Sequence, residues 1–409
     1  MSRRGELDVL VVGAGAIGGA IALALARDGF DVGVIEARPP RPWRGEDEVD
    51  LRVVALAPDA RALLDDLGVW PAIAAARAAA YRRMHVWDAC APGSLSFDAA
   101  ERGEAALGWI VENRLIQHAL WQALQAFAPA AAFPPQGARE GGAVRVFCPA
   151  ELAELDEGEN GLAATLADGT RLRARLLVAA EGAESAVRAR LGVAFEGRDY
   201  GQRAVVAHVA TERPHEDTAW QRFQPGGPLA FLPLADGRCS IVWSLPEAEA
   251  ARVLALDDAA FRAELGCAFD FRLGAIGAAT ARAAFPLRLR LAERYAAGRC
   301  LLAGDAAHVV HPLAGQGMNI GFRDAICLRR VLRAARARGS DIGAAHVLRR
   351  YERERRSEST LAARGLDAIE RVFGTGRLPV AVLRGAGLAF ADRAAPIKRW
   401  LADTAAGRA

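Results

Sequence analysis

The chain has 409 residues and a formal net charge of +3 at pH 7, with 52% hydrophobic and 25% charged residues. This composition excludes a disordered chain, and the length exceeds one ordinary hydrophobic core, so we expect two closely packed domains. The small net charge and the lack of a dense basic stretch exclude nucleic acid as an expected partner.

The cysteines and the N-terminal residues bear on the cellular compartment. Six cysteines are scattered along the chain without a C-x-x-C pair, which favours reduced thiols over a disulfide framework or a zinc site. The first ten residues, MSRRGELDVL, lead into an apolar run with no cleavable signal peptide. We therefore expect a cytoplasmic protein.

Residues 7–26, LDVLVVGAGAIGGAIALALA, carry a single charge and are long enough to span a bilayer. Three glycines favour another interpretation. Gly13, Gly15 and Gly18 have the spacing G-x-G-x-x-G between a valine-rich run and a segment of helical spacing. The pattern predicts a strand, a tight turn and a helix that stops at Gly29.

A second valine-rich run, DVGVIEA, predicts a neighbouring buried strand that ends on Glu36. In dinucleotide-binding folds the first glycine makes the turn, the second admits a pyrophosphate, and the third lets helix and strand pack closely. The helix N-terminus offers N–H groups to the phosphates, and a carboxylate about 20 residues further on binds ribose hydroxyls. Glu36 follows Gly18 by 18 residues. The expected dinucleotide-binding residues are Gly13, Gly15, Ala16, Ile17, Gly18, Glu36 and Ala37.

The middle of the chain alternates between helical and strand patterns. Helical spacing precedes Gly68, and residues 111–127 predict an amphipathic helix with its leucines on one face. Between residues 141 and 180, short alternating runs predict strands, with Asp168-Gly169 as a hairpin turn. These elements continue the nucleotide fold.

Residues 200–290 are richer in aromatic and β-branched side chains, broken by turn pairs such as Gly226-Gly227. They predict an antiparallel sheet that forms a separate layer. From residue 299 a strand, a turn and a helix return, and the remainder is mostly helical. We expect an α/β fold with nucleotide-binding segments at 1–75, 111–195 and 291–335, sheet segments at 76–110 and 196–290, and C-terminal helices at 336–409.

The run LLAGD ends on Gly304-Asp305 and predicts a strand with a carboxylate at its C-terminal end, where open α/β sheets bind ligands. Asp305 is therefore expected to accept hydrogen bonds from a polyol chain. The next loop, PLAGQGMN at residues 312–319, runs into a helix. Backbone N–H groups there would stabilise negative charge, such as that on the N1–C2=O edge of a reduced flavin.

Together these motifs resemble the single-component, FAD-dependent aromatic hydroxylases. Within that group the chain is most similar to the ubiquinone-biosynthesis hydroxylases. The stretches LRVVALAPDA, VENRLIQHAL and RFQPGGPLAFLPLADGRCSIVWS carry this similarity, as does the tail from residue 387 to residue 407. The resemblance covers essentially the whole chain.

The resemblance implies a Rossmann-like FAD-binding domain, an inserted antiparallel-sheet substrate domain and a helical C-terminal region. It implies FAD as cofactor, NAD(P)H as electron donor and O2 as co-substrate. The implied reaction hydroxylates the ring of a polyprenylated phenol through a flavin C4a-hydroperoxide. No second G-x-G-x-x-G is present, so NAD(P)H would bind without a Rossmann unit of its own. A ubiquinone-biosynthesis complex and a peripheral membrane contact are the implied partners, and the basic, Trp-containing segment 390–402 suits anionic lipid.

Carried over residue by residue, the resemblance adds flavin contacts beyond the first motif. They are Arg52, Asn113, Arg114, Glu181, Arg188, Gly304, Asp305, Gly315, Gln316, Gly317, Met318 and Asn319. Glu181 departs from the family pattern, which has aspartate there. The extra methylene changes the reach of the carboxylate by about 1.5 Å. The change affects a motif tied to FAD and NAD(P)H handling in the family.

Four residues of the expected sheet are predicted to line a substrate chamber: Phe223, Phe231, Pro233 and Trp243. His308 and Pro312 are the candidates for residues beside the reacting ring, with His308 as a base. His308 and His311 lie three residues apart, but no carboxylate or cysteine completes a ligand set, so no metal is expected. No Ser/His/Asp triad is evident, which fits a cofactor that carries the chemistry.

Two alternatives remain open from the sequence. One is a hydroxylase of a small soluble aromatic, such as a benzoate or a pigment precursor, which would need a buried arginine for a carboxylate. The other is a non-catalytic flavin-binding scaffold of a biosynthetic complex. A flavin-dependent halogenase is disfavoured because its W-x-W-x-I-P signature is absent.

Overall fold

A computed structural model describes residues 6–127, 142–310, 316–373 and 378–407. Its first layer is an eight-stranded sheet with the strand order β18-β19-β11-β1-β2-β8, which the hairpin β9–β10 extends from β11. Strands β19, β11, β1, β2 and β8 run parallel. The bounds are β1 (Leu7–Val12), β2 (Val32–Ile35), β8 (Val144–Phe147), β9 (Leu152–Glu157), β10 (Leu162–Leu166), β11 (Arg171–Ala179), β18 (Ala296–Ala297) and β19 (Cys300–Leu302).

Helices cover this sheet, and their packing explains the apolar runs of the sequence. Helix α1 follows β1 directly and packs against α4 and α8. The central strands are buried on both faces, and every residue of β2 is inaccessible, as expected for a parallel sheet between helices. The helices of this part are α1 (Ala16–Arg27), α2 (Pro58–Asp66), α3 (Trp70–Arg77), α4 (Asn113–Phe127), α5 (Ala186–Arg190) and α8 (Gln316–Ala337).

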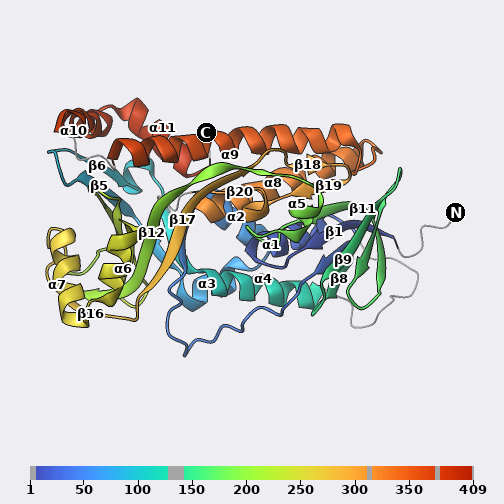
Figure 1. Cartoon of the computed structure of the whole chain (residues 1–409), viewed down its shortest axis with the longest axis horizontal. Helices are drawn as coiled ribbons and strands as arrows, with labels where there is room; N and C mark the ends of the chain where they lie inside the picture. Colours follow the sequence, from blue (N-terminus) through green and yellow to red (C-terminus); the bar gives the residue numbers. More distant parts are fainter. Residues whose placement is uncertain (1–5, 128–141, 311–315, 374–377, 408–409) are drawn as a thin grey trace.

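The second layer is a nine-stranded sheet with the order β20-β17-β12-β15-β14-β13-β5-β6, with β16 paired to β12. The long strands β12 and β17 run together across the middle of the molecule (Figure 1). The bounds are β5 (Arg83–Asp88), β6 (Ser94–Asp98), β12 (Phe195–Thr211), β13 (Thr218–Phe223), β14 (Leu229–Pro233), β15 (Cys239–Pro246), β16 (Ile276–Ala279), β17 (Ala283–Ala292) and β20 (His308–Val309).

Two features of this region differ from the expected purely antiparallel sheet. Strands β13 and β5 pair in parallel, because β5 arrives from a distant part of the chain rather than through a hairpin. Helices α6 (Glu247–Ala255) and α7 (Asp258–Ala268) lie within the segment that was expected to be sheet alone. They bury Val253, Phe261 and Leu265 against one face of the sheet.

A third, small sheet consists of β3 (Val53–Leu56), β7 (Gly108–Glu112) and β4 (Ala79–Tyr81). The amphipathic pattern of residues 111–127 is confirmed as helical from residue 113, whereas its first two residues end β7. Short 3-10 turns lie at Ala100–Arg102 and Gly304–Ala306.

The chain closes with three helices: α9 (Ala345–Phe373), α10 (Leu378–Arg393) and α11 (Ala395–Ala405). Helix α9 runs along one side of the molecule, and α10 and α11 lie at the end nearest β5 and β6 (Figure 1). Among the helices of the described residues, none combines the length and the apolar character that crossing a membrane requires. The expected α/β fold with a second sheet and a helical C-terminal region is confirmed.

Candidate active site

A cavity of about 930 Å³ lies between the two large sheets. We call it the larger cavity. Turns that follow β1, β2, β11 and β19 line one side, and β12, β15 and β17 line the other. The carboxyl ends of parallel strands meet at one edge of a sheet, so ligands of open α/β folds bind there. The described part of the chain thus joins a nucleotide crevice to the face of a second sheet.

The glycine motif shapes the first wall of the larger cavity. A Cβ atom on Gly13 would lie 2.6 Å from the carbonyl oxygen of Ala180, and one on Gly18 would lie 1.9 Å from that of Gly13. Both positions therefore require glycine for close packing. A Cβ atom on Gly15 would meet no protein atom within 4 Å, because this residue borders the cavity. A pyrophosphate bound at the start of α1 would need open space at this position.

Helix α1 begins at this wall with its N–H groups available. Gly15 is its N-cap residue and provides no side-chain cap, and the first turn contains no acidic residue. Ala16 and Ile17 line the cavity with Gly15, whereas Gly18 packs behind it. An uncapped helix N-terminus at an open cavity is suited to an anion.

Glu36 and Ala37 follow β2 and also line the larger cavity. The Glu36 carboxylate accepts a hydrogen bond of 2.6 Å from the Ala14 amide and one of 3.1 Å from the Arg38 amide. These bonds hold the carboxylate beside the glycine turn. A ribose at this place would find an acceptor that is already oriented.

Asp305 lies on the 3-10 turn after β19, across the cavity from α1. It makes no hydrogen bond with another described residue, and its side chain is open to the cavity although protein surrounds the rest of it. Burial raises the pKa of Asp305, while the charges of His308 and Arg52 partly offset that effect. Arg52 lines the same cavity. Asp305 is an unused acceptor in a recess.

Asn113 begins α4 and lines the larger cavity. Its Oδ1 atom is buried and has no hydrogen-bond partner. Arg114, which the sequence placed in the same set, does not line the cavity; its guanidinium lies 3.0 Å from the Asp47 carboxylate. Only one of these two neighbours therefore faces the site.

The two expected flavin contacts near the end of β11, Glu181 and Arg188, also differ in whether they face the cavity. Glu181 lines the larger cavity, and its Oε1 atom accepts a hydrogen bond of 2.9 Å from the Val187 amide at the start of α5. Arg188 lies outside the cavity lining: its guanidinium donates to the Ala183 carbonyl and lies 3.7 Å from the ring centroid of Phe195. Burial lowers the pKa of Arg188. The longer side chain of Glu181 thus reaches the backbone of α5.

The residues at the start of α8 occupy different places. Gly317 and Met318 line the larger cavity. Asn319 is buried, donates to the Ala55 carbonyl at 2.8 Å and accepts from the Ala57 amide at 2.9 Å, so it ties α8 to β3. Gln316 begins the helix, and Pro312 and Gly315 lie outside the described residues, as does His311.

His308 is 1% exposed and does not line the larger cavity. Its Nε2 atom lies 2.6 Å from Asp324, whose carboxylate also accepts bonds from the Gly304 amide and from Arg355. Within the described residues His308 therefore acts as part of a buried charged cluster behind the Asp305 turn. Sequence reasoning missed Asp324 and Arg355, because nothing local marks residues 16 and 31 positions apart as partners.

The four residues expected to form a substrate chamber do not line the larger cavity. Phe231 stacks on Phe269 at 3.7 Å, and Trp243 is buried in the same cluster beneath α6 and α7. Phe223 stacks on Phe373, and Pro233 ends β14. Side chains alternate along a strand, so the cavity receives the intervening positions. The residues that line it from this sheet are Ala204, Val206, Val242, Phe285, Pro286, Leu287, Arg288 and Val309.

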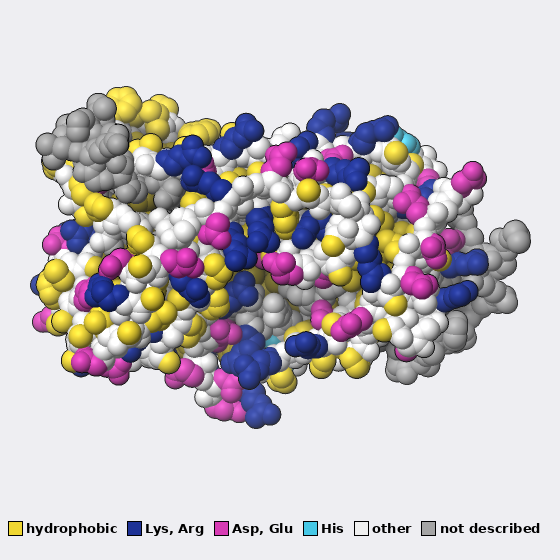
Figure 2. Space-filling model, in the orientation of Figure 1, with side chains coloured by type: hydrophobic (Ala, Val, Ile, Leu, Met, Phe, Trp, Pro, Cys, Tyr) yellow, Lys and Arg dark blue, Asp and Glu magenta, His cyan; other side chains and the backbone are white. Residues whose placement is uncertain are grey.

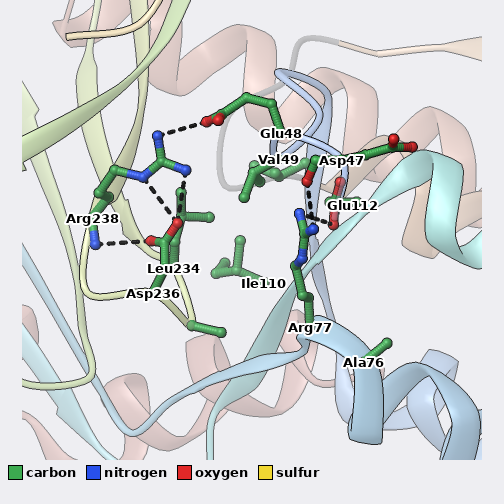
Figure 3. A pocket seen from close by; sticks show the side chains of 12 residues that line it. Asp47, Glu48, Val49, Ala76, Arg77, Ile110, Glu112, Leu234, Asp236 and Arg238 are labelled. Carbon is green, nitrogen blue, oxygen red and sulfur yellow. Dashed lines mark hydrogen bonds and ion pairs between the residues drawn. The ribbon is translucent and has the colours of Figure 1, made fainter. Parts of the chain in front are cut away.

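A smaller cavity of about 360 Å³ is lined by residues of α3, β3, β7 and the turn that follows β14. Figure 3 shows Arg77 beside Glu112 on one side and Arg238 beside Asp236 and Glu48 on the other. The residues between them are apolar, and one of these, Val53, lines both cavities. The two cavities are thus neighbours.

A family model described as an FAD binding domain matches residues 6–364. The chain belongs to this FAD-binding family. The 3-demethoxyubiquinol 3-hydroxylase of Escherichia coli strain K12 is 37% identical over 392 residues, which cover 96% of each chain. The human mitochondrial ubiquinone biosynthesis monooxygenase COQ6 is 34% identical, covering 96% of this chain and 90% of its own. The resemblance found in the sequence is confirmed.

Solved structures agree with the fold. The p-nitrophenol 4-monooxygenase PnpA from Pseudomonas putida DLL-E4 has a TM-score of 0.74 at 20% identity and covers 99% of each chain. Klebsiella pneumoniae HpxO complexed with FAD and uric acid has a TM-score of 0.71 at 21% identity, covering 98% of this chain and 96% of its own. With the family match and the curated relatives, these results identify the protein as an FAD-dependent monooxygenase, a class that typically uses NAD(P)H and O2.

The described residues fit FAD. Gly15 leaves open space beside an uncapped helix N-terminus, Asp305 is an unpaired acceptor, and the Oδ1 atom of Asn113 is buried without a partner. These three features lie around one cavity. Each is what a bound dinucleotide would complete.

Proposed function

We propose that this protein hydroxylates the aromatic ring of a polyprenylated phenol in ubiquinone biosynthesis. The names of its relatives support the pathway. The observation that carries the proposal is the larger cavity, which continues from the nucleotide crevice onto an apolar sheet face with Val206, Val242 and Leu287. Such a wall suits an aromatic ring with a hydrocarbon tail.

We propose the following roles for the cavity-lining residues. The start of α1 would donate hydrogen bonds to the pyrophosphate, Glu36 would accept them from the ribose, and Asp305 would accept them from the ribityl chain. Gly317 and Met318 line the larger cavity at the start of α8, and backbone N–H groups there would face the flavin ring. The chain segments 1–75, 111–195 and 291–335 would form the FAD-binding unit.

Bound FAD would supply the oxygen activation that no side chain can provide. The protein's own part is to hold the phenol ring against the sheet, to keep water out and to orient the cofactor. Leu287 is 3% exposed and Ala204 is 4% exposed, whereas Phe285 of the same wall is 42% exposed, so only the part of the wall at Leu287 and Ala204 is shielded from solvent. Where water is excluded, a reactive oxygen species formed on the cofactor would react with the substrate ring and not with water.

The arginines of the larger cavity argue against a benzoate-type substrate. A buried guanidinium would be needed to hold a carboxylate away from water. Arg52 and Arg190 are exposed, and the Arg288 side chain is 40% exposed. Among the described lining residues, therefore, no buried arginine supports the small-molecule alternative.

The C-terminal helices support a peripheral membrane contact through which a lipid-soluble substrate would arrive. Phe390 is 65% exposed, Ile397 is 39% exposed and Trp400 is 60% exposed. Figure 2 shows hydrophobic side chains at the upper left, where Figure 1 draws α10. Arg393 and Arg399 are exposed beside them, which suits an anionic surface at the inner face of the membrane.

The test is mass spectrometry of the quinone pool in a deletion strain grown in air. Loss of ubiquinone with accumulation of an under-oxygenated prenylphenol is expected, and the wild-type gene should restore the pool. A D305N gene serves as the comparison, because its weaker FAD binding should restore the pool less completely than the wild-type gene does. An unchanged pool in a strain without another hydroxylase for the step would contradict the proposal.

A further inference from the structure

Glu112 is a buried carboxylate that holds a neighbouring loop in place. It ends β7 and is 2% exposed. Its Oε2 atom accepts a hydrogen bond of 2.8 Å from the Asp50 amide, and its Oε1 atom accepts one of 3.1 Å from the Trp43 indole N–H. The Arg77 guanidinium lies 3.4 Å from the same Oε1 atom and supplies the counter-charge (Figure 3). One side chain of β7 therefore anchors both ends of segment 43–50.

The hydrogen bonds continue from this carboxylate to the backbone of Arg52. The Asp50 side chain accepts a bond of 2.9 Å from the Arg52 amide, and the Arg52 carbonyl oxygen accepts one of 2.9 Å from the Asn113 amide. Asn113 follows Glu112 directly, so these bonds close a ring. Glu112 is also paired with Val53 in the ladder of β7 and β3. The backbone of Arg52 is thus fixed from both sides.

Arg52 brings a free positive charge to the larger cavity. It lines this cavity, and its guanidinium makes no hydrogen bond or ion pair with another described residue. Its charge reaches Asp305, because it partly offsets the effect of burial on the pKa of that carboxyl. The uncapped start of α1 at Gly15 borders the same cavity. A free guanidinium there is available to an anionic group of FAD.

Further side chains bind the outer part of segment 43–50. The Arg114 guanidinium lies 3.0 Å from the Asp47 carboxylate, and the Arg238 guanidinium lies 2.7 Å from the Glu48 carboxylate. Both carboxylates reach solvent, so water weakens these ion pairs. Glu112, in contrast, is buried and bonds the end of the segment that continues into the cavity wall.

We propose that Glu112 is the positioning residue that sets the place of the Arg52 charge in the larger cavity. Through Asp50 and Asn113 it fixes the Arg52 backbone, and the guanidinium then contributes to the binding of an anionic group of FAD. Rigid support behind a binding residue raises affinity, because less order has to be created when the ligand binds. The inference rests on the proposed FAD site and deepens it, since it assigns a buried carboxylate to cofactor affinity.

The experiment titrates FAD into the apoproteins of the wild type, E112Q, R52Q and the double variant, followed by flavin fluorescence. R52Q should weaken FAD binding about tenfold at low salt, because it removes a charge-assisted contact. E112Q should weaken it about three- to tenfold, because glutamine keeps the shape but places an amide N–H2 group against a donor. The double variant should bind FAD as weakly as R52Q alone, since both changes act through one guanidinium.

Salt separates this role from a purely structural one. The Debye length falls to about 3 Å at 1 M salt, so both losses should shrink to less than about twofold there. E112D keeps both carboxylate oxygens and should retain most of the affinity. E352Q is the matched control, because Glu352 also accepts a bond of 2.7 Å from a backbone amide, that of Tyr295, but does not line the larger cavity. It should leave FAD affinity unchanged.

Three outcomes would overturn the inference: unchanged FAD affinity in E112Q or R52Q, equal losses in E112Q at low and high salt, or losses that multiply in the double variant. If the wild-type apoprotein binds no FAD, the proposed function fails instead. Thermal melts of each apoprotein show which variants are folded. If E112Q does not fold, E112D takes its place, and its smaller loss must likewise vanish at 1 M salt and in the R52Q background.

Discussion

The imidazole Nε2 of His308 lies 2.6 Å from the Asp324 carboxylate, and both side chains are inaccessible to solvent. Arg355 donates to the other oxygen of the same carboxylate at 2.7 Å. The Gly304 amide donates to it at 2.8 Å, so the cluster connects α8 and α9 to the turn that carries Asp305. The buried Asp324 carboxylate thus holds the turn that carries Asp305 in place at the edge of the larger cavity.

Replacement of Asp324 by asparagine should therefore destabilise the protein strongly. It removes the buried carboxylate partner of Arg355 and leaves Glu358, whose side chain is 54% exposed. Breaking a buried ion pair costs about 3 to 5 kcal/mol in other proteins. The free energy of urea unfolding measures the effect. D65N is the control, because Asp65 pairs with Arg61 at 3.4 Å and the two side chains are 44% and 36% exposed, so it should cost less than about 1 kcal/mol. Equal losses in the two variants would contradict the argument.

The same cluster predicts an acid dependence of stability. Burial alone would raise the pKa of Asp324, but His308 and Arg355 outweigh it and hold that pKa below the ordinary value. A carboxyl with a lowered pKa contributes stability that is present above its unfolded pKa of about 3.9 and is lost as pH falls below it. Unfolding free energy measured from pH 5 to pH 3 should fall less steeply in D324N than in the wild type. Parallel curves would show that Asp324 is not responsible.

The glycine turn allows a separation of folding from cofactor binding. G15A adds a methyl group where no protein atom lies within 4 Å, whereas G18A places one 1.9 Å from the Gly13 carbonyl oxygen. We expect G15A to keep the wild-type melting temperature of the apoprotein and to weaken FAD binding by at least about tenfold, or about 1.4 kcal/mol. G18A should lose about 1 to 3 kcal/mol of stability through overpacking. Fluorescence titration with FAD and thermal melts distinguish the two variants. Unchanged FAD affinity in G15A would show that the pyrophosphate does not bind beside Gly15.

Much of this crevice could be predicted because its signals are local. The glycine spacing, Glu36 and Asp305 each lie within a few residues of the strand end that positions them, so a short stretch of sequence specifies both the element and the residue that lines the cavity. The substrate wall could not be predicted in the same way. Aromatic side chains such as Phe231 and Trp243 indicated a chamber, but strand alternation and the cover of α6 and α7 bury them in a core on the opposite face.

Replacement of Asp305 by asparagine should act on the cofactor rather than on the fold. Burial raises the pKa of Asp305, so at neutral pH the ionised carboxylate lowers the stability of the apoprotein, and a neutral amide removes that effect. We expect D305N to melt at the same or a slightly higher temperature without FAD, and to bind FAD about tenfold more weakly through loss of a charged acceptor. A large fall in apoprotein stability would show that Asp305 is structural.

The exposed aromatic residues of the C-terminal helices predict binding to vesicles. Trp400 and Phe390 together should contribute more than about 1.5 kcal/mol when they enter a lipid interface, which is about tenfold in partitioning. The double variant F390S/W400S should therefore sediment at least about tenfold less with phosphatidylglycerol vesicles than the wild type. Phe271→Ser is the matched control, since Phe271 is 52% exposed in the segment after α7, which Figure 1 draws at the lower left, whereas α10 lies at the upper left. Equal sedimentation of all three proteins would show that Phe390 and Trp400 do not bind the membrane, so the substrate would not arrive through these helices.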